Sequence, residues 1–401
     1  MPKLRICRPA YCHELMLRNE NVLGNTAQVF LQGLYPPSEA ATAATLTNGT
    51  AQFNPLDGYQ YVLLNGEPAT APDSIWIKGD QYCPAMTNAS KLYFQSQDFL
   101  SRQPILQPFY DKFTPLLQGV FPQSEIGFQS AYGIFDYLNV GYQHNQTIYN
   151  SLSADDLFQL RTLADSQELA LVYNTSSPIV SIGGKTLSAA ILNQLSTTVA
   201  GADTNLKITY FAASYSVFQA FFGISGLLEA SADFYGLPDY ASTMVFELRK
   251  PVGVSAENTF FVRFGFRNGS LPSAPLNMYP LFGRTQIEAD IPWNQFFSAM
   301  TTQSVSSQAD WCHACVDSNQ TFCAAYPVNQ TTTALPQTGK TGGSNGGLSL
   351  VGAGAIGAGV TIVVIAIIEG LLALGWIVRK RRVSKRKAAL SDTASEKSML
   401  A

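Results

Sequence analysis

The stretch from Lys207 to Leu227, KITYFAASYSVFQAFFGISGL, has the pattern of a strand that turns into a helix at a site of chemistry. Residues 208–211 alternate as in a strand, and the apolar residues that follow recur at helical spacing. The carboxyl end of such a strand often carries a catalytic group, and the helix after it favours an anion at its amino end. Here the turn holds Ser214, Tyr215 and Ser216, without His, Asp or Lys. Hydroxyl groups therefore stand where acid–base or nucleophilic groups are expected.

A cysteine-rich segment is the second place where chemistry is conceivable. WCHACVDSNQTFC brings Cys312, His313, Cys315 and Cys323 together. Zinc sites use two separated ligand pairs at regular spacing, which this segment lacks. Disulfides are the default state of cysteines in an exported protein. We therefore expect disulfides at these three cysteines and at Cys83, with the pairing open, and no metal or other cofactor.

The charge of the chain is divided by an apolar segment near its carboxyl end. Residues 1–345 hold 17 Lys/Arg and 25 Asp/Glu, whereas the last 24 residues hold 8 Lys/Arg and 2 acids. Between them, residues 348–378 contain one charge, Glu369, and are long enough to span a hydrocarbon core of about 30 Å as a helix. Seven of the nine residues in 379–387 are basic. The positive-inside rule predicts a transmembrane helix at 348–378 and a basic cytoplasmic tail at 379–401.

The part before this span has the features of an extracellular or lumenal domain. Asn-x-Ser/Thr sequons are glycosylated in the secretory pathway, and all seven sequons of the chain precede the span. We expect N-linked sugars at Asn48, Asn88, Asn145, Asn174, Asn268, Asn319 and Asn329. Residues 329–347 are rich in Thr, Gly and Pro and indicate a stalk that is too polar to fold. The predicted location is the plasma membrane or another membrane of the secretory pathway.

The amino terminus does not match this location. MPKLRICRPAYCHELMLRNEN lacks the continuous apolar region of a signal peptide, which a glycosylated domain of this length needs. We therefore expect either a natural start further upstream or an insertion that the transmembrane helix itself directs.

Residues 1–328 have the pattern of one α/β domain without an internal linker. Residues 157–173 have helical apolar spacing, and residues 241–250 and 259–269 are typical of strands, the second ending in an Asn-Gly turn. The sequence has no internal repeat, no glycine-rich phosphate loop and no coherent basic patch, so we expect no nucleic-acid partner.

Several segments of this domain resemble, in the right order, the histidine acid phosphatases, which belong to the phosphoglycerate-mutase-like superfamily. NTAQVFLQGLYPP (residues 25–37) is similar to that family's SAQAFLAGLYPP helix, and GDQYCPAM to its Cys-Pro segment. Three later segments resemble the later strands and a helix of that family: LPDYASTMVFELRK, FFVRFGFRNGS and NMYPLFGRTQIEADIPWNQFFSAM. The resemblance covers most of residues 16–300. Within the family, the sequence looks most like the membrane-anchored fungal branch. It implies an α/β sandwich with a helical cap region.

The same resemblance shows which catalytic residues of the family this sequence lacks. The family's nucleophilic histidine lies in an Arg-His-Gly-x-Arg motif at the first strand, and Arg-His-Gly does not occur in this sequence. A further phosphate-binding arginine falls on Val22, and Arg18 takes that place only if a gap is allowed. The His-Asp pair falls on Tyr215 and Ser216, or one residue earlier on Ser214 and Tyr215. Neither alignment restores an imidazole or a carboxylate for general acid catalysis.

These departures favour a protein that keeps a phosphatase fold and has lost hydrolysis. The remaining histidines, His13, His144 and His313, do not stand in a phosphatase motif. Groups that act as a catalytic unit lose orders of magnitude in rate when several are absent. Our hypothesis is a glycosylated single-span surface protein, with a phosphorylated small molecule as its potential ligand. The alternatives are an active acid phosphatase whose first strand and motif are missing from this sequence, and an unrelated adhesion or wall protein.

Overall fold

The computed structural model describes residues 5–8, 11–17, 20–62, 64, 66–201, 206–250, 260–316 and 318–327, with the backbone alone for 5–8, 11–17 and 206. The chain divides into two units, Met1–Asn329 and Gln330–Ala401. The second unit holds the predicted stalk, transmembrane helix and tail, all of which lie outside the described residues. In the part that is described, no helix is long and apolar enough to cross a membrane.

The described strands pair into three sheets. β1 pairs antiparallel with β2, β2 pairs parallel with β5, and β3 pairs antiparallel with β4. β7 pairs antiparallel with β6, β8 and β9. Their bounds are β1 Arg5–Arg8, β2 Tyr11–Leu17, β3 Ala44–Thr45, β4 Ala51–Gln52, β5 Leu206–Ala212, β6 Thr243–Arg249, β7 Phe261–Arg267, β8 Asn277–Tyr279 and β9 Asp290–Pro292.

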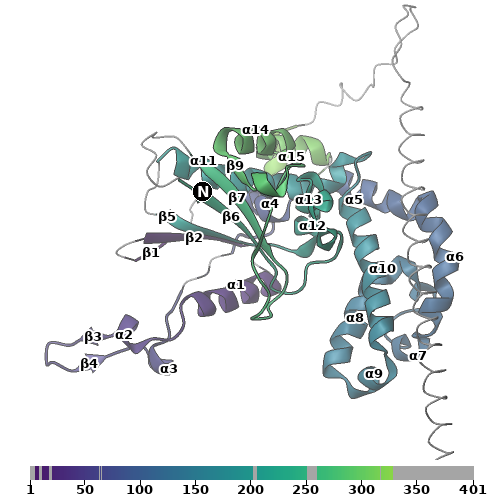
Figure 1. Ribbon diagram of the computed structural model, residues 1–401, viewed down its shortest axis with the longest axis horizontal. Helices are drawn as coiled ribbons and strands as arrows, with labels where there is room; N and C mark the ends of the chain where they lie inside the picture. Colours follow the sequence, from purple (N-terminus) through teal and green to yellow (C-terminus); the bar gives the residue numbers. More distant parts are fainter. Residues whose placement is uncertain are drawn as a thin grey trace, which may run out of the picture. The chain divides into compact units, whose positions relative to one another are not determined.

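Helices make up most of the remaining regular structure (Figure 1). Their bounds are α1 Asn21–Leu34, α2 Glu39–Thr42, α3 Pro55–Gly58, α4 Ile75–Lys78, α5 Pro84–Lys91, α6 Gln97–Asp111, α7 Thr114–Leu117, α8 Ala131–His144, α9 Gln146–Ser151, α10 Ala154–Val172, α11 Ile182–Val199, α12 Tyr215–Ile224, α13 Leu227–Ala230, α14 Trp293–Gln303 and α15 Gln308–Cys315.

The apolar side chains of this unit gather in three main buried clusters. The helical cluster lies among α6 to α10, which Figure 1 shows grouped together. The sheet cluster joins β7 and β9 to α11, α12 and α14. The disulfide cluster joins α4, α11 and α15 with Cys83, Cys312 and Cys315. Because α11 contributes to the sheet cluster and the disulfide cluster, it is the element that joins these two parts of the core.

Helix α12 owes its close fit on α11 to a glycine. A Cβ atom at Gly184 would lie 2.6 Å from the backbone of Ala220 and of Phe221. Real Cβ atoms do not approach backbone so closely, so a larger residue would push the two helices apart. This contact holds the middle of α12, the helix at whose amino end Ser214 lies, against α11.

One disulfide fixes the segment that follows α4, and a second one lies beside it. Cys83 pairs with Cys315, and Cys312 pairs with Cys323, which confirms the expected disulfides and settles their pairing. Beside them, the indole Nε1 of Trp311 donates a hydrogen bond of 2.8 Å to the carbonyl oxygen of Gly79. The residues that follow α4 are therefore held to α15 by a covalent bond and by a buried hydrogen bond.

The main secondary-structure predictions are confirmed. The predicted strand-to-helix segment forms β5 and α12, and the helical spacing of residues 157–173 belongs to α10. The two predicted strands after it form β6 and β7. The mixture of helices and sheets agrees with the α/β class, whereas the finer assignment to a phosphoglycerate-mutase-like sandwich stays a prediction.

Candidate functional site

The turn between β5 and α12 places three hydroxyl groups at the end of the strand. Ser214 is the N-cap residue of α12 and has extended backbone angles, but its side chain makes no capping hydrogen bond. Ser, Thr, Asp and Asn at this position usually accept a bond from a backbone N–H of the first helical turn. The hydroxyl of Ser214 instead contacts the side chains of Lys78 and of Ser216.

A chain of hydrogen bonds joins this turn to the segment after α4. The Lys78 Nζ donates to Ser214 Oγ at 2.8 Å, and Ser214 Oγ lies 2.9 Å from Ser216 Oγ. Ser216 Oγ in turn donates to Asp80 Oδ2 at 2.9 Å. All four side chains are half-buried. Two hydroxyl groups therefore connect a cation at one end of this series of hydrogen bonds with a carboxylate at the other end.

The carboxylate end of this chain is short of donors. Asp80 Oδ1 is buried and has no hydrogen-bond partner, so Ser216 is the one described donor to this carboxylate. The Asp80 side chain lies beside the amino end of α11: a Cβ atom at Gly183 would lie 3.3 Å from the Cβ of Asp80. The positive end of the α11 dipole favours a negative charge there.

The side chain of Tyr215 points away from these hydrogen bonds, toward the helical cluster. Its hydroxyl donates to Glu168 Oε2 on α10 at 3.0 Å, and its ring lies 5.0 Å from the ring of Tyr132 on α8. Burial raises the pKa of Glu168 above its usual range, although the hydrogen bond from Tyr215 opposes this. Burial and the nearby carboxylate also raise the pKa of Tyr215. Burial therefore favours the neutral form of each group more than water does, and Tyr215 is a poor proton donor.

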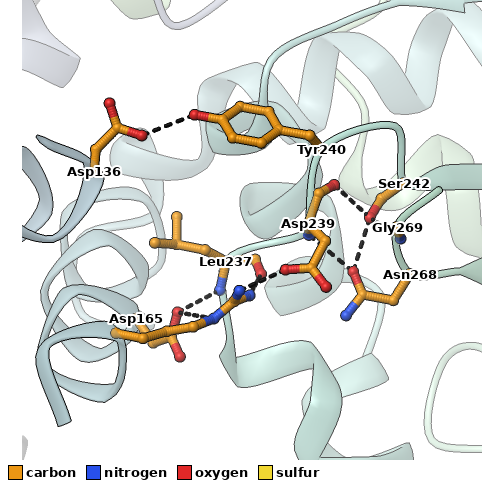
Figure 2. A network of polar contacts seen from close by, with 9 residues as sticks. Asp136, Asp165, Leu237, Asp239, Tyr240, Ser242, Asn268 and Gly269 are labelled. Atoms are coloured by element: carbon orange, nitrogen blue, oxygen red, sulfur yellow. Dashed lines mark hydrogen bonds and ion pairs between the residues drawn. The ribbon is translucent and has the colours of Figure 1, made fainter. Parts of the chain in front are cut away.

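A second polar network holds the loop that leads into β6 against the same two helices (Figure 2). Asp165 Oδ1 accepts a hydrogen bond of 2.8 Å from Leu237 N, and Asp136 Oδ1 accepts one of 2.8 Å from the Tyr240 hydroxyl. Burial is the larger cause, and the hydrogen bond to Asp136 the next, of a rise in the pKa of Tyr240 to about 12.

The arginine and asparagine of this network complete its hold on the loop. Arg161 donates to the Leu237 carbonyl and to the Asp239 carboxylate. Asn268 Oδ1 accepts from Asp239 N at 2.9 Å and from Ser242 Oγ at 2.8 Å (Figure 2). The network connects the helices to the sheet and leaves its carboxylates committed to these partners.

The remaining predicted site residues lie apart from the strand end. Val22 lies on α1 with a 73% exposed side chain. His144 and His313 are exposed. Arg18 and the side chain of His13 lie outside the described residues. In the described part of the chain, no three His, Cys, Asp or Glu side chains form a group that could hold a metal ion.

The asparagines of the predicted sequons are accessible wherever the structure describes them. Asn48, Asn88, Asn145, Asn174, Asn268 and Asn319 are all exposed. Asn329 lies outside the described residues. Exposure is necessary for glycosylation but does not demonstrate it, so the sugars stay a prediction.

Sequence reasoning missed the residues that surround the strand end. Lys78 and Asp80 lie 136 residues before their partners Ser214 and Ser216, and Glu168 lies 47 residues before Tyr215. The available signal was weak: Asp80 belongs to the GDQYCPAM segment that resembles the Cys-Pro region of the phosphatases. Its distance in sequence from Ser216 hid its role.

Comparisons with known proteins find similarity among solved structures. No protein-family model matches the chain, and no curated protein matches it. Among solved structures it is similar to a structure of the phytase from Citrobacter braakii, with a TM-score of 0.46 and 12% sequence identity. The match covers 75% of this chain and 81% of the phytase. A similarity of this degree carries no argument about the family or the activity of this chain.

Proposed function

We propose that this chain is a membrane-anchored glycoprotein of the fungal branch of histidine acid phosphatases, with residues 1–328 as its outer domain, and that it does not hydrolyse phosphomonoesters through a phosphohistidine. The support for the family is the ordered resemblance of its sequence segments, together with the helix α1 and the strands β6 and β7 that those segments form. The support for the loss of hydrolysis is the set of side chains at the end of β5.

That set is the observation on which the proposal depends. The three residues on which the His-Asp pair falls are Ser214, Tyr215 and Ser216, and each hydroxyl is hydrogen-bonded to a charged or ionisable side chain or to another hydroxyl. Asp80 and Glu168 do lie close by, but they come from other elements and bind these hydroxyls. A general acid must reach the leaving oxygen of its substrate, and a carboxyl committed to a neighbouring hydroxyl is poorly placed to do so.

Strand β2 adds a second argument. It pairs in parallel with β5, and Leu17 at its end faces Ala212 at the end of β5. Parallel strands end at the same edge of a sheet, so β2 ends at the edge where Ser214 lies. The sequence of β2 and of the residues after it, up to Val22, contains no Arg-His-Gly, which agrees with loss of hydrolysis.

A phosphorylated small molecule remains the ligand class that we propose for the strand end. Lys78 is a cation beside the amino end of α12, where the helix dipole favours an anion. Asp80 and Glu168 oppose it with negative charge when they are ionised. We therefore propose weak binding that depends on Lys78, without turnover.

The hydrolysis of 4-nitrophenyl phosphate by the purified full chain, from pH 3 to pH 7, tests this function. We expect the same rate for the wild type and for Lys78→Met, because residual activity would come from contaminants. Phosphate binding, measured by calorimetry, should be weak in the wild type and lost in Lys78→Met. A wild-type rate that falls at least a hundredfold in Lys78→Met would support the alternative, an active acid phosphatase.

A further inference from the structure

A cavity of about 420 Å³ opens between α11, α14, α4 and the end of β5. Its floor is built by Trp76, Ala189, Ala190 and Phe211. Trp76 and both alanines belong to the disulfide cluster, and Phe211 packs against the disulfide cluster and the sheet cluster. The cavity therefore lies between the disulfide cluster and the sheet cluster. The small side chains of Ala189 and Ala190 leave it unfilled. Its volume is in the range of pockets that hold small molecules, about 300–1,000 Å³.

Three of the polar side chains that line this cavity already donate their hydrogen bonds within the protein. The Trp76 Nε1 donates to Asp73 Oδ1 at 3.1 Å. The Thr301 hydroxyl donates to the Phe297 carbonyl at 2.7 Å, and the Ser304 hydroxyl to the Met300 carbonyl at 2.6 Å. These three groups offer no donor to a ligand, and a ligand group buried beside them without a hydrogen bond is costly. Trp76, Ala189, Ala190 and Phe211 line the cavity together with the buried amide of Gln194, so the body of a ligand that fits is mainly apolar.

The mouth of the cavity differs from its floor. Asn193 and Ser306 are exposed and Ser196 is half-buried, and all three line the cavity. Within the described part of the chain, the Asn193 amide and the two serine hydroxyls make no hydrogen bond to another residue. They can therefore donate to and accept from a ligand whose polar end reaches the mouth.

None of the described residues that line the cavity carries a charge. A charged ligand would lose its hydration there without gaining an ionic partner. We propose that this cavity is a binding site for a neutral small molecule with an apolar, ring-sized body and one uncharged hydrogen-bonding end, such as a hydroxyl or an amide. This site is separate from the strand end at Ser214 and takes the opposite class of ligand, because a phosphorylated molecule is excluded from it.

Two naphthalene derivatives of matched shape test the proposal. 2-Naphthol is neutral at pH 7 and carries one hydroxyl, whereas 2-naphthoate has the same ring system and a negative charge. Equilibrium dialysis of the full chain in a single detergent should give saturable binding of one 2-naphthol per chain. Binding of 2-naphthoate should be at least tenfold weaker. Equal binding of the two molecules would overturn the argument from charge, and the absence of saturable 2-naphthol binding would overturn the site itself.

Three variants connect the binding to this cavity. Ala189→Phe fills the floor and should abolish 2-naphthol binding, whereas Ala200→Phe, at the exposed end of the same helix, should leave it unchanged. Thr301→Phe narrows the mouth from an exposed position, so it decides the matter if Ala189→Phe fails to fold by circular dichroism. Retained binding in folded Thr301→Phe and Ala189→Phe variants would contradict the assignment, because detergent partitioning is the same for all of them.

Discussion

The carboxylate of Asp80 makes a sharp prediction about its serine partner. Ser216 is the one described donor to Asp80, whose other oxygen is buried without a partner. A hydrogen bond to a charged group contributes about 1.5–3 kcal/mol net, so Ser216→Ala should lower the free energy of unfolding by about that amount. Ser214→Ala should cost less, about 0.5–1.5 kcal/mol, because the half-buried Lys78 amine can turn to water.

Urea unfolding of the full chain, with a double-mutant cycle, separates this explanation from a general packing loss. Ser216→Ala should cost about 2 kcal/mol in the wild type and less than about 0.5 kcal/mol in an Asp80→Ala background, where no carboxylate is left unpaired. The reasoning would be refuted by equal costs of Ser216→Ala in the two backgrounds, or by a larger cost for Ser214→Ala than for Ser216→Ala.

Three other predictions concern the contacts around the site. Glu168→Gln should have no effect on the free energy of unfolding in acid and should raise it increasingly as pH rises above about 4.5. The reason is that the pKa of Glu168 is higher in the folded than in the unfolded protein, so the wild type loses stability as this carboxyl ionises. Urea unfolding at several pH values checks this. Asn268→Ala should lower the midpoint of thermal unfolding through the loss of about 1 kcal/mol, whereas Ser270→Ala, which removes the sequon alone, should not. Replacing both Cys83 and Cys315 by alanine should cost about 5 kcal/mol in urea unfolding, since this disulfide closes a separation of 232 residues.

The contrast between local and distant contacts explains what could be predicted from the sequence. The segment that forms β5 and α12 carries its own signal, because strand alternation and helical spacing are local patterns. The pairing of Cys83 with Cys315 has no local signal, since four cysteines allow three pairings. The role of Lys78 depends in the same way on a contact with a turn 136 residues later.

Strand β2 shows a second reason for a missed element. YCHELML has polar residues on both faces of an extended chain and does not alternate, so its pattern gave no strand. Its structure comes from parallel pairing with β5, which is a property of the fold and not of the segment.

The most direct test of the central claim is a search for the phosphoenzyme. The full chain is mixed with a ³²P-labelled phosphomonoester at pH 5 and quenched in alkali, in which phosphohistidine survives. The account predicts no label on the chain at any mixing time, because none of its three histidines stands in a phosphatase motif. Label that approaches one phosphate per chain, located on a histidine by mass spectrometry and lost on a chase with unlabelled substrate, would contradict it.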